Sequence, residues 1–219
     1  MLARPARPRR WRSGAHDRPP TAPNARRLGG LAPDGGTARD GDGVEARALT
    51  ELVEAALSRS WRRDSTLHGD DHWRCVAATG LALAHRVDGV DRTLVFCFGL
   101  LHDARRETDS FDSEHGPRAA SLAGTLRDEG ALTLDDDRFE RLAAALVGHS
   151  NGLVSADPTI GTCWDADRLH LPRVGIDPVP ALLSTEAAWG EAPAAAAALL
   201  RSVGAPSWEE LIASVTPRA

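Results

Sequence analysis

Histidine and aspartate residues recur at the ends of apolar segments in the middle of the chain. His72 precedes one such segment, His102-Asp103 closes a second, His149 closes a third, and Asp167 lies in a fourth. If each segment is a helix of one bundle, these side chains meet at a polar centre, and bundles bind metals at such centres. Imidazole and carboxylate ligands suit Zn, Mn, Fe, Co or Ni better than Cu(I).

Each of these residues also has an ordinary structural explanation. A single histidine at a helix end is usually a cap or a partner of the helix dipole, and an isolated His-Asp pair is weak evidence of a site. His16 and His85 fit the capping role alone. The ordered set of His72, His102-Asp103 and Asp167 on separate predicted helices is what favours a metal site.

Apolar periodicity predicts helices from about residue 46 onward, and no alternating segment or Asn-Gly hairpin signal accompanies them. The predicted fold class is therefore all-α. The run 94–101 is apolar on every side, which fits a buried helix or strand, and its length and neighbours favour a helix. The predicted helices cover approximately 46–57, 71–87, 92–105, 118–130, 137–149, 164–171, 180–189 and 193–203, with a last one opening at the capping box of Ser207 and Glu210.

The composition of the 219 residues excludes several kinds of chemistry. The chain contains no lysine and no tyrosine, which rules out a P-loop lysine, a Schiff-base lysine and a tyrosine acid. Cys75, Cys97 and Cys163 lack CxxC spacing, so neither a disulfide scaffold nor a Cys-rich zinc site is expected. No apolar run approaches the ~18 residues of a membrane span. We expect a cytoplasmic protein with no membrane partner.

Residues 1–45 differ from the rest of the chain. They carry a net charge of +4 against −9 for residues 46–219, and they are rich in proline and glycine without any apolar period. We expect a disordered extension before one helical domain over 46–219. A basic arm and a targeting peptide are the alternatives. The segment lacks the apolar core of a secretory signal, and the negative charge of the domain opposes nucleic-acid binding.

The ordered set resembles the HD-domain superfamily of metal-dependent phosphohydrolases. His72, followed four residues later by Val76-Ala77, is similar to the first helix motif of the family. Residues 100–103 (Leu-Leu-His-Asp) resemble its eponymous element, and residues 166–169 (Ala-Asp-Arg-Leu) its closing motif. The resemblance covers about 65–190 and implies an HD-domain helical bundle. It also implies a divalent metal ion (Mn, Co, Ni, Mg, Zn or Fe) held by His72, His102, Asp103 and Asp167.

The resemblance implies roles for further histidines. Residues 114–120 and His149-Ser150 resemble the extra histidine motifs of some branches of the family. Asp103 could then bridge to a second metal held by His115 and His149, or these two histidines could contact substrate. We expect His68, one helical turn before His72, to face the substrate. Asp165 is expected to orient a ligand histidine.

Hydrolysis of a phosphate ester needs an activated water and charge neutralisation, which a divalent metal supplies, and arginines that clamp the phosphate oxygens. Arg105 and Arg106 follow the His-Asp pair by about one turn, and Arg118 follows His115 by three residues. Glu107 is a candidate general acid or base, although related nucleotidases place this acid at a different spacing. A solvated Arg-Glu face is the alternative for these residues.

The function predicted from this pattern is hydrolysis of a small phosphate ester, such as a nucleotide. Two rivals are a di-iron oxygenase on the same scaffold and a non-catalytic regulatory module that binds a ligand. The expected partner is a small-molecule phosphate substrate, nucleic acid is not expected, and a homo-oligomer is left open. The acidic loop 108–114 is either a lid or a solvated loop. Trp73 and Trp164 flank proposed ligands and fit packing better than base stacking.

Overall fold

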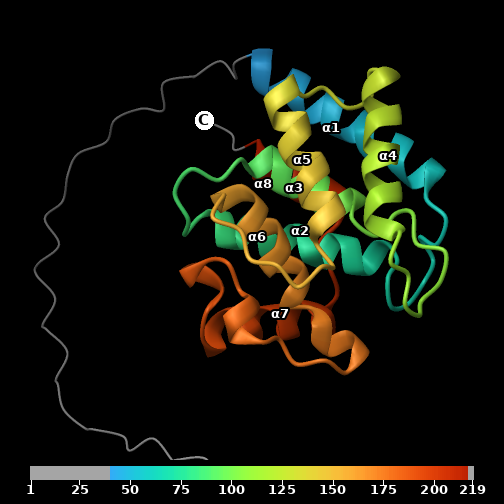
Figure 1. Ribbon diagram of the computed structural model, residues 1–219. Coiled ribbons are helices and arrows are strands. Elements are labelled where there is room, and N and C mark those ends of the chain that lie inside the picture. The colour runs from blue at the N-terminus through green and yellow to red at the C-terminus, as the bar shows by residue number, and fades with distance from the viewer. Residues whose placement is uncertain (1–39, 217–219) are drawn as a thin grey trace, which may run out of the picture. The chain divides into compact units, whose positions relative to one another are not determined.

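The computed structural model describes residues 40–216, and this range contains eight α-helices, three short 3-10 helices and no strand. The all-α fold class is thereby confirmed. No helix in the described range is long and apolar enough to cross a membrane. The elements are α1 (Asp40–Arg59), α2 (Asp70–Ala84), α3 (Arg92–Leu101), α4 (His115–Asp128), α5 (Asp136–Gly148), α6 (Pro158–Arg168), η1 (Leu171–Val174), η2 (Pro180–Leu182), η3 (Glu186–Ala188), α7 (Glu191–Val203) and α8 (Trp208–Val215) (Figure 1).

The predicted helices are all present except one, and their ends differ by a few residues. Helix α1 begins at Asp40 rather than at Ala46, so only residues 1–39 of the predicted extension lie outside the described range. Helix α6 begins earlier than predicted, because Asp157 caps it by accepting hydrogen bonds from the next turn. The prediction of a helix over 180–189 was wrong. The segment forms the two short helices η2 and η3. The residues that separate these helices, Ser184 and Thr185, donate their backbone N–H groups to the Asp165 carboxylate instead of to a helix.

Helix α3 is the centre of the bundle, which explains its apolar character on every side. Residues 94–101 are all buried, and α3 packs against α1, α2, α4, α5, α6 and α8 (Figure 1). Its contact with α2 is especially close. A Cβ at Gly99 would lie 2.6 Å from the Cβ of Ala77, and one at Gly80 would lie 2.5 Å from Val95 Cγ1. The glycines therefore let the two helices approach, and this fixes the spacing of the side chains beyond their ends.

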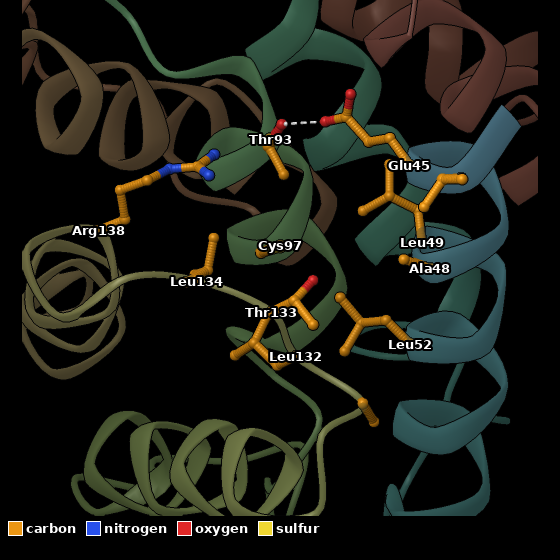
Figure 2. A pocket seen from close by; sticks show the side chains of 12 residues that line it. Glu45, Ala48, Leu49, Leu52, Thr93, Cys97, Leu132, Thr133, Leu134 and Arg138 are labelled. Carbon is orange, nitrogen blue, oxygen red and sulfur yellow. Dashed lines mark hydrogen bonds between the residues drawn. The ribbon is translucent and has the colours of Figure 1, made fainter. Parts of the chain in front are cut away.

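A cavity of about 440 Å³ lies between α1, α3 and the segment 131–134. Leucine and alanine side chains make up half of its lining. Thr93 Oγ1 donates to Glu45 at 3.2 Å, and Figure 2 shows Arg138 across from this pair. Cys97 is part of the wall, and burial raises the pKa of its thiol to about 12. A thiol that stays protonated is a poor nucleophile. None of the residues predicted for the site lines this cavity.

Candidate metal centre

Two groups of side chains bring potential metal ligands together at one end of the bundle. The first group is His72, His102 and Asp167, and the second group is Asp103, His115 and His149. Within each group the candidate ligand atoms lie within 4.8 Å of one another. Five of the six side chains are at most 4% exposed, and Asp167 is 13% exposed. Each group could hold a metal ion.

The six residues come from five helices whose ends meet. His72 lies in the first turn of α2 and His115 opens α4, whereas His102-Asp103 follow α3 and His149 follows α5. Asp167 lies in the last turn of α6. The start of α4 is pressed against the end of α5, since a Cβ at Gly116 would lie 2.6 Å from the Leu146 carbonyl oxygen. The packing of the bundle therefore assembles both groups.

Distances within the groups match the separation of ligands on a shared ion. Ligand atoms ~2.0–2.2 Å from one metal lie roughly 3 Å apart from each other. In the first group, His72 Nε2 is 3.2 Å from His102 Nε2 and 3.3 Å from Asp167 Oδ1. In the second group, the Nε2 atoms of His115 and His149 are 2.7 Å apart. The side chain that joins the first group is His72, as the resemblance implied, and not His68.

Asp103 lies between the two groups and presents one carboxylate oxygen to each. Its Oδ2 is 3.7 Å from His72 Nε2 and 3.6 Å from His102 Nε2. Its Oδ1 is 3.4 Å from His115 Nε2 and 3.8 Å from His149 Nε2. A carboxylate placed in this way could bridge two ions.

Backbone carbonyls hold three of the four imidazoles with Nε2 toward the centre. The Nδ1 atoms of His102 and His149 lie 3.1 Å and 2.7 Å from the carbonyl oxygens of Gly99 and Leu146. Nδ1 of His115 pairs in the same way with the carbonyl of Asp112. An Nδ1–H that donates to a carbonyl leaves Nε2 as the unprotonated nitrogen, which is the form that binds a metal.

Burial keeps most of the imidazoles neutral. It lowers the pKa of His72 to about 3 and of His115 to about 4, and it lowers the pKa of His102 as well. His149 differs. Burial lowers its pKa, but the Asp103 carboxylate, 3.8 Å from its Nε2, outweighs burial and raises the pKa of His149. Neutral imidazole is the form that a metal site needs at neutral pH.

Both carboxyl groups are ionised despite their burial. Burial opposes the charge on Asp103, but the adjacent His102 and His149 outweigh it and hold the pKa well below its usual value. Burial opposes the charge on Asp167 as well, but His72, whose Nε2 is 3.3 Å from Asp167 Oδ1, and the nearby His102 outweigh it and hold the pKa of Asp167 well below its usual value. Two buried negative charges that face four imidazole nitrogens form an environment that favours a cation.

A cavity of about 460 Å³ opens beside these ligands, and we call it the site cavity. Asp103, His115, His149 and Asp167 line it, together with His68, Arg106 and Arg173. Nη1 of Arg106 is 3.3 Å from Asp103 Oδ1, and Nη atoms of Arg173 are 3.8 Å from Asp103 and from Asp167. His68 Nδ1 is 3.3 Å from Asp109 Oδ1. A small anionic molecule in this cavity would meet two guanidinium groups and a histidine.

Three residues predicted for catalysis or substrate binding do not line the site cavity. The guanidinium of Arg105 lies 4.7 Å from the ring centroid of Trp61. Arg118 donates to Asp112 at 2.6 Å, and Glu107 is exposed beside it. For Arg105 and Glu107 the cause is the end of α3 at Leu101, because the helical spacing used to place these side chains no longer applies beyond it. Arg118 lies within α4, but its guanidinium is held by Asp112 and the Arg105 carbonyl. Arg106, which was predicted with Arg105, does line the cavity.

The structure also tests the roles predicted for Asp165 and for the two tryptophans beside the ligands. Asp165 does not orient a ligand histidine, since its carboxylate accepts hydrogen bonds from Ser184 N, Thr185 N and Thr185 Oγ1. The indole groups of Trp73 and Trp164 pack in the core and donate to the carbonyls of His68 and Ala145.

Sequence reasoning missed Arg173 and His170. His170 is fully buried, its Nε2 is 2.8 Å from Thr79 Oγ1, and its ring centroid is 6.1 Å from that of His72. Arg173 is held by its Nε–H, which donates to the Leu67 carbonyl at 2.8 Å. The only signal in the sequence was their place directly after the last ligand helix, in a segment too short to show periodicity.

No protein-family model, no curated protein and no solved structure matches this chain. The geometry of the two groups and of the site cavity is therefore the basis for assigning a function.

Proposed function

We propose that this protein is a metal-dependent phosphohydrolase of the HD type that acts on a small phosphate ester. The observation that carries the proposal is Asp103, which faces the first group with Oδ2 and the second group with Oδ1. A divalent ion in each group would supply an activated water and would polarise the phosphoryl oxygen. The resemblance of the ordered set His72, His102-Asp103 and Asp167 to the HD superfamily supports the same assignment.

The residues around the ligands have roles in this reaction. Arg106 and Arg173 bind phosphate oxygens, since both guanidinium groups line the site cavity within 4 Å of ligand carboxylates. His68 also lines the cavity, and Asp109 engages its Nδ1. Its Nε2 is then the atom that can exchange a proton with the leaving group. His68 thus takes the role that the sequence assigned to Glu107.

The proposal is tested by metal analysis of the purified protein and by a screen for phosphate release. The screen covers nucleotides, sugar phosphates and simple phosphate monoesters with Mn, Co, Ni, Mg, Zn and Fe. We expect up to two ions per chain and release of phosphate that chelation abolishes. A protein that binds its metal fully and releases phosphate from none of these compounds contradicts the proposal.

A di-iron oxygenase is the second candidate, and the second group is the observation that favours it. His115 and His149 add two imidazoles to a bridging carboxylate, which suits iron. Iron content and oxygen consumption separate the two functions. Stoichiometric iron with consumption of oxygen, in the absence of phosphate release, would establish the oxygenase.

A further inference from the structure

Polar and apolar side chains both line the site cavity. The polar ones include the ligands and the arginines described above. The apolar ones, which we call the apolar wall, are aliphatic residues of the segment 171–182 and one aromatic residue of the loop 108–114. They are Leu171, Val174, Ile176, Val179, Leu182 and Phe111. A molecule that fills the cavity therefore contacts both charged groups and hydrocarbon.

Part of the apolar wall is exposed to solvent. Phe111 is 91% exposed, Ile176 53% and Val179 52%. Gly152 also lines the cavity, and the two residues that follow it in the sequence, Leu153 and Val154, are each 55% exposed. Single exposed apolar residues are ordinary, but several around one cavity mark a binding surface.

The same helix that supplies a metal ligand anchors the apolar wall. On α6, Asp165 accepts hydrogen bonds from the backbone of residues 184 and 185, directly after the wall. Arg168 donates to the carbonyls of Leu182 and Leu153. Asp167, between these two anchors, faces the first group. These contacts tie the end of the wall at Leu182 to the helix that carries Asp167.

The lining is poorly suited to a nucleotide. Among the described residues that line the cavity, Phe111 is the one phenylalanine, tyrosine or tryptophan, and no asparagine or glutamine is present to read the edge of a base. Asp177 also lines the cavity, and its carboxylate would repel a further phosphate. An alkyl or aryl group in the cavity needs no hydrogen-bond partners, so their absence from the lining does not weaken its binding.

Resting on the phosphohydrolase function, we propose that the substrate is a phosphate monoester of an apolar alcohol, with an alkyl or aryl group on the apolar wall. Water attacks phosphorus, the bond from phosphorus to the ester oxygen breaks, and that oxygen takes a proton. The products are inorganic phosphate and the free alcohol. The alcohol leaves along the exposed part of the wall.

The test measures kcat/KM for linear alkyl phosphates from methyl to octyl, beside adenosine monophosphate and ribose 5-phosphate, with the metal-loaded protein. We expect kcat/KM to rise about two- to fourfold per methylene group until the wall is covered. The octyl ester should exceed both sugar-containing compounds. Val179→Ser and Ile176→Ser should lower the ratio of octyl to methyl phosphate at least about fivefold. Val203→Ser is the matched control, because Val203 is 70% exposed on α7 and lies outside the cavity.

A flat dependence on chain length, a preference for adenosine monophosphate, or an equal loss in Val203→Ser would overturn the proposal. So would a dimer that Val179→Ser dissociates in sedimentation, since the wall would then be an interface between copies. Calorimetry with methyl- and octylphosphonate separates this proposal from the reaction itself. If octylphosphonate binds more tightly than methylphosphonate and Val179→Ser removes the difference, the apolar subsite is supported even if the protein hydrolyses no ester.

Discussion

Arg106 Nη1 lies 3.3 Å from His115 Nε2, at the edge of the second group. Nδ1 of His115 is engaged by the Asp112 carbonyl, so Nε2 carries the lone pair and the guanidinium points toward it. The same guanidinium donates to the Thr108 and Ser110 carbonyls at 3.3 Å and 2.9 Å, which fixes it in place. An anion bound beside the second group would therefore find a preorganised positive charge.

The first prediction follows from this arrangement. Arg106→Gln should lower kcat/KM for phosphate release by about 10- to 100-fold, which corresponds to the loss of one or two charge-assisted contacts. Arg105→Gln is the matched control, because Arg105 packs on Trp61 outside the site cavity. Its activity should stay within about threefold of the unaltered protein. Equal losses in the two variants would remove Arg106 from the site.

The second prediction concerns the second group. His115→Gln and His149→Gln should retain the fold and lower phosphohydrolase activity by at least ~10-fold, which is about 1.4 kcal/mol in the transition state. Because both Nε2 atoms face Asp103 Oδ1, bound metal should fall from two ions per chain to one. Metal analysis at saturating metal checks the stoichiometry. Unchanged stoichiometry with lost activity would make the two histidines substrate contacts, and unaltered rates would exclude them from the site.

The third prediction is that Asp103→Asn weakens both groups at once. The two carboxylate oxygens serve different groups, and an amide offers one oxygen and no charge. We expect the variant to bind less than one ion per chain, a larger loss than in either histidine variant. Retention of one full ion would show that the groups bind independently of Asp103.

Much of this site could be predicted from the sequence, because its ligands close or open strongly periodic helices. Helical spacing placed His72, His102 and Asp167 at one end of the bundle, and the structure brings them together. The same reasoning failed for Arg105 and Glu107, since α3 ends at Leu101 and a turn has no fixed period. Arg173 could not be predicted from the sequence. Its guanidinium is positioned by the Leu67 carbonyl, which is far away in the sequence, and by the His170 carbonyl, which lies in a short turn.

The fourth prediction concerns stability against pH in the metal-free protein. His72 and His115 have pKa values of about 3 and about 4 when folded, against 6.5 for an unperturbed histidine. The unfolded chain therefore binds more protons, and stability is lost as the pH falls from about 6.5 toward 4. The lowered pKa values of Asp103 and Asp167 act in the same direction, whereas the raised pKa of His149 opposes them.

Thermal unfolding of chelator-treated protein between pH 7.5 and 4.5 checks this dependence. The Tm should fall steadily below pH 6.5, and saturating metal should move the fall to lower pH, since bound metal excludes protons from the ligands. His72→Phe, which cannot titrate, should flatten the curve of the metal-free protein. A Tm that is constant or rises on acidification would contradict the assignment of neutral buried imidazoles.

The last prediction tests the packing that positions the first group. A methyl group at Gly99 would stand 2.6 Å from the Cβ of Ala77 and 2.7 Å from its Cα, which is backbone and cannot give way. Gly99→Ala should therefore destabilise the protein by about 1–3 kcal/mol, as overpacked cores do. Gly124→Ala in α4 is the matched control, because its nearest neighbour is Phe139 Cζ at 3.9 Å. The higher helix propensity of alanine at position 124 should stabilise the protein by up to about 1 kcal/mol.

Urea unfolding measures the stability of both variants. Because the Gly99 contact sets the approach of α2 to α3, Gly99→Ala should also weaken metal binding, and Gly124→Ala should leave metal binding unchanged. Equal stabilities in the two variants would mean that α2 and α3 are not in the close contact that brings His72 to His102.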